Sequence, residues 1–148
     1  MTKPLLYCSI FILLFSSCSK DEVKGPSQEA IIAKEAMDLV NSIKEAYMAQ
    51  DEEKIKQMIS SEQVLKDLSF SGGPVTSSPT SLEFLFRWID IYNSKGGEVT
   101  VADVYVSWKG LWKKDSKEIE QKGLALFVLE GRPFKLKKIL RENPFVRP

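Results

Sequence analysis

Histidine is missing from this chain of 148 residues, and cysteine occurs only twice. Without imidazole the protein cannot carry a Ser-His-Asp or Cys-His catalytic centre, or a metal site with histidine ligands. Neither sign of charge dominates, because 21 Lys and Arg stand against 20 Asp and Glu, and a net charge of +1 gives no reason to expect nucleic-acid binding. Hydrophobic residues make up 43% of the chain, which suits one folded domain and argues against disorder.

Long hydrophobic runs are also missing, and the longest one is too short to cross a membrane. It covers residues 5–15 and follows the basic residue Lys3. A membrane span needs about 20 apolar residues, whereas the apolar part of a secretory signal has ~7–15. We therefore predict that residues 1–17 are a signal peptide.

The end of this signal resembles the lipobox of bacterial lipoproteins. Phe15-Ser16-Ser17-Cys18 places two small residues before a cysteine, although Phe15 stands where Leu is commoner. The resemblance implies that the Cys18 thiol receives a diacylglycerol, that the signal is cut before it, and that the chain is held in the membrane by acyl chains. Each buried acyl CH₂ contributes about 0.8 kcal/mol to such an anchor. A plain secretory signal or an uncleaved anchor is the alternative.

Residues 18–27 are interpreted as a lipid-anchored tether in the cell envelope. Ser19 resembles the residue after the cysteine in lipoproteins sorted to the outer membrane. Lys20-Asp21-Glu22 is similar to the surface-export signal of some lipoproteins, but a plain charged linker explains it equally well. Cys8 leaves with the signal and Cys18 is acylated, so no thiol remains for a disulfide, a metal or a nucleophile.

Helical periodicity follows the tether. Apolar residues recur at helical spacing from Ile32 to Tyr47, which predicts an amphipathic helix beginning at Ser27 or Gln28. Asp51 is expected to cap a second helix, and residues 60–68 to form a third short one. Residues 69–80 are predicted to be a loop.

A fourth helix is predicted over residues 81–93. Thr80 and Glu83 have the spacing of a capping box, and the segment between them and Asn93 is apolar on all sides. After it the pattern changes to period two and predicts three strands, over residues 98–113, 122–130 and 134–140. A charged turn over 113–121 and a tight turn at Gly131-Arg132 would separate them, and Asp103 would mark a bulge.

Helices followed by antiparallel strands predict a single α+β domain over residues 28–148, with N-terminal helices packed on a curved antiparallel sheet. The segment Glu45 to Asp51, the short helix after it and the ending over 135–139 are similar to NTF2-like (SnoaL-like, cystatin-like) domains. The resemblance implies a cone, in which a curved sheet wraps a long helix around an apolar cavity. It does not imply one activity, because members include isomerases, dehydratases and binding proteins.

Candidate ligand-binding residues are aromatic, although aromatic side chains more often fill a core. The pocket candidates are Tyr47, Trp88, Tyr92, Tyr105 and Trp108. Tyr47, Asp103 and Tyr105 are also the residue types that ketosteroid-isomerase-type members use, but no motif aligns them, so no catalytic role is assigned.

Candidates for a partner-binding surface are Trp112, expected to be exposed, and the lysines of the last strand, Lys135, Lys137 and Lys138. A solvated sheet face, on which the lysines discourage edge-to-edge aggregation, is the preferred explanation of these lysines. No motif predicts a cofactor, a metal or nucleic acid. The preferred hypothesis is a lipid-anchored, non-enzymatic domain that binds a small ligand or an envelope protein; the alternatives are an envelope isomerase or lyase and a subunit of an envelope complex.

Overall fold

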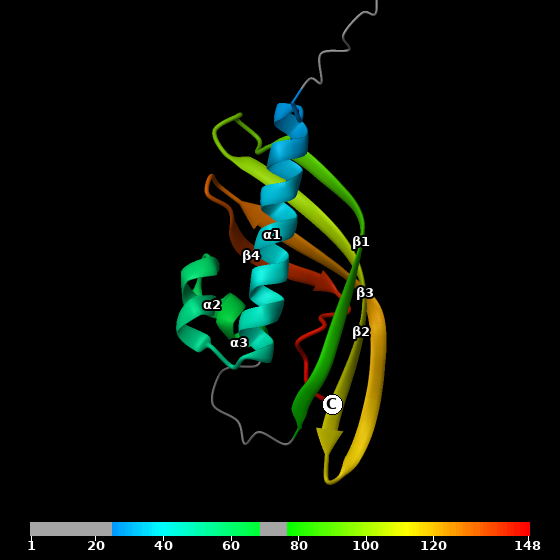
Figure 1. The fold of residues 1–148 in the computed structure, drawn as a ribbon. Coiled ribbons are helices and arrows are strands. Elements are labelled where there is room, and N and C mark those ends of the chain that lie inside the picture. The colour runs from blue at the N-terminus through cyan, green and yellow to red at the C-terminus, as the bar shows by residue number, and fades with distance from the viewer. Residues whose placement is uncertain (1–24, 69–76) are drawn as a thin grey trace, which may run out of the picture.

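The computed structural model describes residues 25–68 and 77–148 as a helical region followed along the chain by a four-stranded antiparallel sheet (Figure 1). The α+β class is thereby confirmed. The predicted signal peptide, Cys18 and the first part of the tether lie outside the described residues. The elements are α1 (Gln28–Met48), α2 (Glu52–Met58), α3 (Glu62–Asp67), β1 (Ser78–Asn93), β2 (Thr100–Lys114), β3 (Lys117–Glu130) and β4 (Lys135–Arg141).

The first helix begins where its periodicity predicts, and the second begins after the predicted cap Asp51. The Ser27 hydroxyl accepts a hydrogen bond from the amide of Ala30 at 3.2 Å, and the Asp51 carboxylate accepts one from the amide of Lys54 at 3.0 Å. Each bond satisfies a backbone donor that the first helical turn leaves free. The buried face of α1 packs against the sheet; its members are Ala36, Val40, Ile43, Ala46 and Tyr47.

The helix predicted over residues 81–93 is wrong, because these residues form β1. Thr80 is no helix cap, since its hydroxyl donates to the carbonyl of Leu111 across the sheet. Phe84 and Phe86 face the core, but a register shift between Phe86 and Trp88 interrupts the alternation. Large apolar side chains also lie on the other face of the strand. Its sequence is therefore apolar at most positions, as the sequence of a buried helix is.

The charged turn predicted over residues 113–121 is also wrong in extent. The turn between β2 and β3 is Asp115-Ser116, and both residues have positive φ values (49° and 65°), as a two-residue hairpin requires. Charged residues continue the ladder on both sides, with Lys113 opposite Glu118. This part of the hairpin is charged because it extends beyond the helices (Figure 1).

The bulge predicted at Asp103 is absent, since β2 stays in register there with both β1 and β3. The irregularities lie instead between Phe86 and Trp88 and between Val128 and Leu129. The second one lets Leu136 and Ile139 both pack toward the core, which period two in β4 does not allow. The turn after β3 is confirmed, with Gly131 at φ 89°.

The main core lies between the helices and one face of the sheet. Its largest fully buried side chains are aromatic: Trp112, Tyr47, Phe127 and Phe145. The chain after β4 therefore closes the core, because Phe145 inserts its ring beside Tyr47 at a centroid distance of 4.8 Å. In the part of the chain that is described, no helix has the length and apolar character to span a membrane.

Candidate functional site

The face of the sheet that points away from α1, α2 and α3 carries no second layer in the described part of the chain (Figure 1). We call it the outer face. Along β2 the core-facing positions Val104, Val106 and Trp108 are buried, and Asp103, Tyr105 and Ser107 between them point outward. The register carries the same alternation to the neighbouring strands, so outward side chains of three strands meet around Tyr105.

These outward side chains form a contiguous apolar surface, which we call the outer patch. Beneath it lies a small buried cluster of Val101, Leu126 and Val128, against which Tyr105 packs. The exposed members of the patch are Leu85, Trp88, Tyr92, Leu124 and Leu140, with 41–57% of their surface accessible. Monomeric proteins rarely expose large contiguous apolar patches unless the patch binds something.

An aromatic stack forms the centre of the outer patch. Trp88 of β1 lies opposite Tyr105 of β2, and their rings stack with centroids 4.3 Å apart and planes inclined by 25°. Trp88 still exposes 55% of its surface. A rigid, half-exposed indole beside a tyrosine is a common anchor in protein interfaces.

Two carboxylates adjoin this stack. Asp90 and Asp103 are directly opposite each other across β1 and β2. Neither forms an ion pair with a cation in residues 25–68 or 77–148. Asp103 Oδ2 accepts a hydrogen bond from the Tyr92 hydroxyl at 3.3 Å, whereas the buried Oδ1 has no protein partner there.

The hydroxyl of Tyr92 responds to this environment. Desolvation raises its pKa above the ordinary value, and the charge of Asp103 and the hydrogen bond to it act in the same direction. Tyr92 therefore stays neutral and remains a donor to Asp103 at neutral pH.

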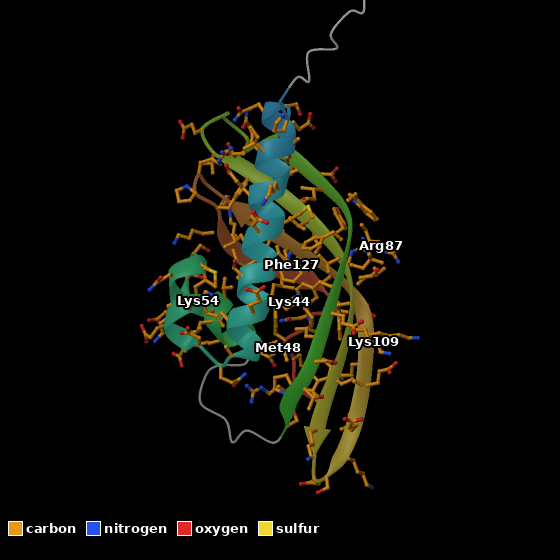
Figure 2. All side chains as sticks on the ribbon, in the orientation of Figure 1. Lys44, Met48, Lys54, Arg87, Lys109 and Phe127 are labelled. Atoms are coloured by element: carbon orange, nitrogen blue, oxygen red, sulfur yellow. The ribbon has the colours of Figure 1, made fainter. Side chains whose placement is uncertain are left out.

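The opposite end of the outer face carries charges of both signs, with Arg87, Lys109 and Lys122 beside Glu83 and Glu120. Arg87 and Lys109 extend away from α1, as Figure 2 shows. Arg87 Nε donates to Ser107 Oγ at 2.7 Å, and Lys109 pairs with Glu120 at 3.0 Å, a contact that raises the pKa of the lysine. A shallow hollow of about 440 Å³ lies here, lined in part by Leu85 and Lys122.

The five predicted pocket residues do not meet in one place. Tyr47 and Trp108 belong to the main core, where the Tyr47 hydroxyl donates to the Phe145 carbonyl and Trp108 Nε1 donates to the Glu142 carbonyl. Trp88, Tyr92 and Tyr105 lie on the outer face. The isomerase-type set is divided in the same way, because Asp103 and Tyr105 lie across the sheet from Tyr47.

The prediction that Trp112 is exposed is wrong, since its side chain is fully buried. Trp112 faces inward from β2, and its ring lies over Gly110, two residues earlier on the same face. The charged hairpin that suggested exposure begins one residue later and points past the core.

The predicted basic strip on β4 is partly engaged within the protein. Lys135 Nζ donates to the Gln57 carbonyl, and Lys137 forms an ion pair with Glu130 at 2.5 Å. Lys138 lies opposite Val128 at the margin of the outer face. These contacts favour the solvated sheet face over a dedicated basic surface.

Sequence reasoning missed Leu85, Asp90 and Leu124 as surface residues of interest. Leu85 and Asp90 were missed because residues 81–93 were predicted to form a helix, in which these side chains would not share a sheet face. The available signal was local: Phe, Trp, Ile and Tyr dominate that segment, and such residues favour strands. Leu124 joins the patch only through its register opposite Ser107.

No protein-family model, curated protein or solved structure matches this chain. The resemblances to lipoproteins and to NTF2-like domains therefore depend on short sequence patterns and on the order of elements. The features of this chain that bear on function are the exposed outer face and the apolar core.

Proposed function

We propose that this protein is a lipid-anchored, non-enzymatic domain of the cell envelope that binds a protein partner through the outer patch. The observation that carries the proposal is the uncovered apolar face around Trp88 and Tyr105, which has its own buried floor and no covering layer in the described residues. Covering this face would remove apolar surface from water, at about 25 cal/mol per Å².

The interior supports binding over catalysis. The fully buried residues of the described ranges are apolar or aromatic apart from Ser77, and no carboxylate, lysine or arginine is among them. A catalytic cavity inside the cone would need an ionisable group in its lining, and the described core offers none beyond Tyr47. The ionisable side chains that line hollows, such as Glu35 and Asp38, are exposed at the surface. Tyr47, the one buried tyrosine of the described residues, donates its hydroxyl to the Phe145 carbonyl and so holds the C-terminal segment.

The proposed architecture is an NTF2-like cone, and the shape of the sheet supports it. The long strands β1 and β2 bow around α1, which lies on their inner side (Figure 1). In this protein Phe127, Phe145 and Trp112 would lie inside the cone. The outer face is the apolar surface that the described residues leave uncovered.

The anchor part of the proposal predicts a large change in fractionation for Cys18→Ala. Wild type is expected in the membrane fraction with the added mass of two or three acyl chains, because one chain alone anchors only marginally. The variant is expected in the soluble fraction with no added mass. Intact mass and fractionation from the native envelope check this, and a wild-type protein that is soluble and unmodified would contradict it.

The binding part is tested by photo-crosslinking in cells. A benzoylphenylalanine at position 124, within the outer patch, is expected to give a discrete crosslinked product. That product should disappear when Trp88→Ser is added. The matched control carries the probe at position 34, on the solvent side of α1, where the Lys34 side chain is 75% exposed. Equal products at both positions, or none at position 124, would contradict binding through the outer patch.

A further inference from the structure

We propose that the partner presents a basic side chain, arginine or lysine, which binds between the Trp88–Tyr105 stack and the carboxylates of Asp90 and Asp103. This inference rests on the proposed function, since it names the chemistry of the partner for the same patch. Three observations on the outer face carry it.

The first observation is the uncompensated negative charge. Like charges directly opposite each other in an antiparallel pair are destabilising. Asp90 and Asp103 are such a pair, and neither takes part in an ion pair within the described residues. Lys138 lies on the same face, with Val128 between it and Asp103. A cation supplied by a partner would be attracted to both carboxylates and would offset the repulsion between them.

The second observation is the free acceptor on Asp103. Its Oδ2 already accepts from the Tyr92 hydroxyl, whereas its buried Oδ1 accepts from no described group. A buried acceptor without a partner costs about 1–3 kcal/mol. Arginine has five N–H donors in a planar fork and lysine has three, so either can donate to a carboxylate. Because the protein itself covers Oδ1, a partner's donor reaches that oxygen only after the Asp103 side chain turns.

The third observation is the adjoining aromatic surface. A cation gains attraction within about 6 Å of an indole ring, and the gain is larger where water is excluded. Trp88 precedes Asp90 by two residues on the outward side of β1 and is half exposed. Leu85 and Leu124 lie beyond it, so the alkyl stem of the basic side chain and its apolar neighbours would also find contacts.

The negative charge at this end of the patch favours a partner with a basic side chain over a membrane surface. Asp90 and Asp103 repel anionic lipid headgroups, which disfavours a membrane surface at this end of the patch. A second copy of the chain, with Lys109 and Lys122 set against the carboxylates, is the competing occupant. Dimerisation in solution distinguishes it from a separate partner.

The test uses the full chain in phosphatidylcholine nanodiscs, titrated with an eight-residue peptide of alternating arginine and leucine. The control peptide replaces each arginine by citrulline, which keeps the shape and removes the charge. Calorimetry reports binding, and so does a change in the tryptophan emission of the protein, to which Trp88, Trp108 and Trp112 all contribute. We expect the citrulline peptide to bind at least about tenfold more weakly than the arginine peptide, which corresponds to a difference in binding free energy of about 1.4 kcal/mol or more.

The variants locate the site. Asp90→Asn with Asp103→Asn is expected to weaken the arginine peptide about tenfold. It should melt at an equal or higher temperature because the like-charge pair is removed, so lost binding would not reflect misfolding. Glu83→Gln is the matched control, since Glu83 is an outward carboxylate of β1 opposite Lys109, and its peptide affinity should match wild type.

Three results would overturn the proposal: equal affinity for the citrulline peptide, no effect of the double variant, or no arginine-peptide binding up to about 1 mM. Dimerisation in sedimentation experiments that is lost in Trp88→Ser, without peptide binding, would assign the patch to a second copy. If crosslinking at position 124 survives while the arginine peptide fails, only the cation chemistry is wrong. If crosslinking also fails, the proposed function fails with it.

Discussion

Phe145→Ala is expected to lower the free energy of unfolding by about 3–5 kcal/mol. Phe145 is fully buried, and its ring lies 4.8 Å from that of Tyr47 and 6.1 Å from those of Phe84 and Phe127. Removing the ring leaves a cavity where α1, the sheet and the C-terminal segment meet, and it removes aromatic contacts worth about 0.5–1.5 kcal/mol each.

Urea unfolding followed by circular dichroism measures this loss. The control is Val146→Ala at the next residue, where 52% of the side chain is exposed and the change should stay within about 0.5 kcal/mol. Similar losses in both variants would mean that the C-terminal segment does not close the core as described.

Gly110→Ala is expected to destabilise the protein by about 1–3 kcal/mol or more, although it adds a single methyl group. A Cβ at position 110 would lie 2.1 Å from Cη2 and 2.3 Å from Cζ3 of Trp112. The indole cannot move aside easily, because it is fully buried and packs edge-on against Trp108 at 6.2 Å. Thermal or urea unfolding measures the effect.

A rescue variant shows that the clash is the cause. Gly110→Ala combined with Trp112→Leu should lose less stability than the sum of the two single changes, because the smaller side chain makes room for the methyl group. Gly25→Ala is the matched control, since nothing lies within 4 Å of its added Cβ. Additive losses would show that Trp112 does not lie over Gly110.

The beginnings of the helices could be predicted because their causes are local. Ser27 and Asp51 cap helices through bonds to amides three residues away, and the apolar spacing from Ile32 to Tyr47 reports a single face. The strands after residue 98 were also recognisable, because period two and β-branched residues are properties of the strand itself.

The segment over residues 81–93 could not be assigned in this way. It is apolar toward both faces of the sheet, and the register shift after Phe86 breaks its period, so its sequence fits a buried helix equally well. Pairing with β2 over its whole length decides for a strand. That pairing joins residues far apart in the chain, so it cannot be recognised from the residues of the segment itself.

By itself, the sequence determined the α+β class, the cap at Asp51, the absence of histidine chemistry and the resemblance of residues 15–18 to a lipobox, because each is a property of composition or of neighbours along the chain. Only the tertiary structure decided which aromatic residues are core and which are surface. Tyr105 and Trp108 are three residues apart, yet one lies on the outer patch and the other in the main core, because the sheet separates them. The pairing of β1 with β2 likewise brings Trp88 to Tyr105 and Asp90 to Asp103, and so creates the candidate site.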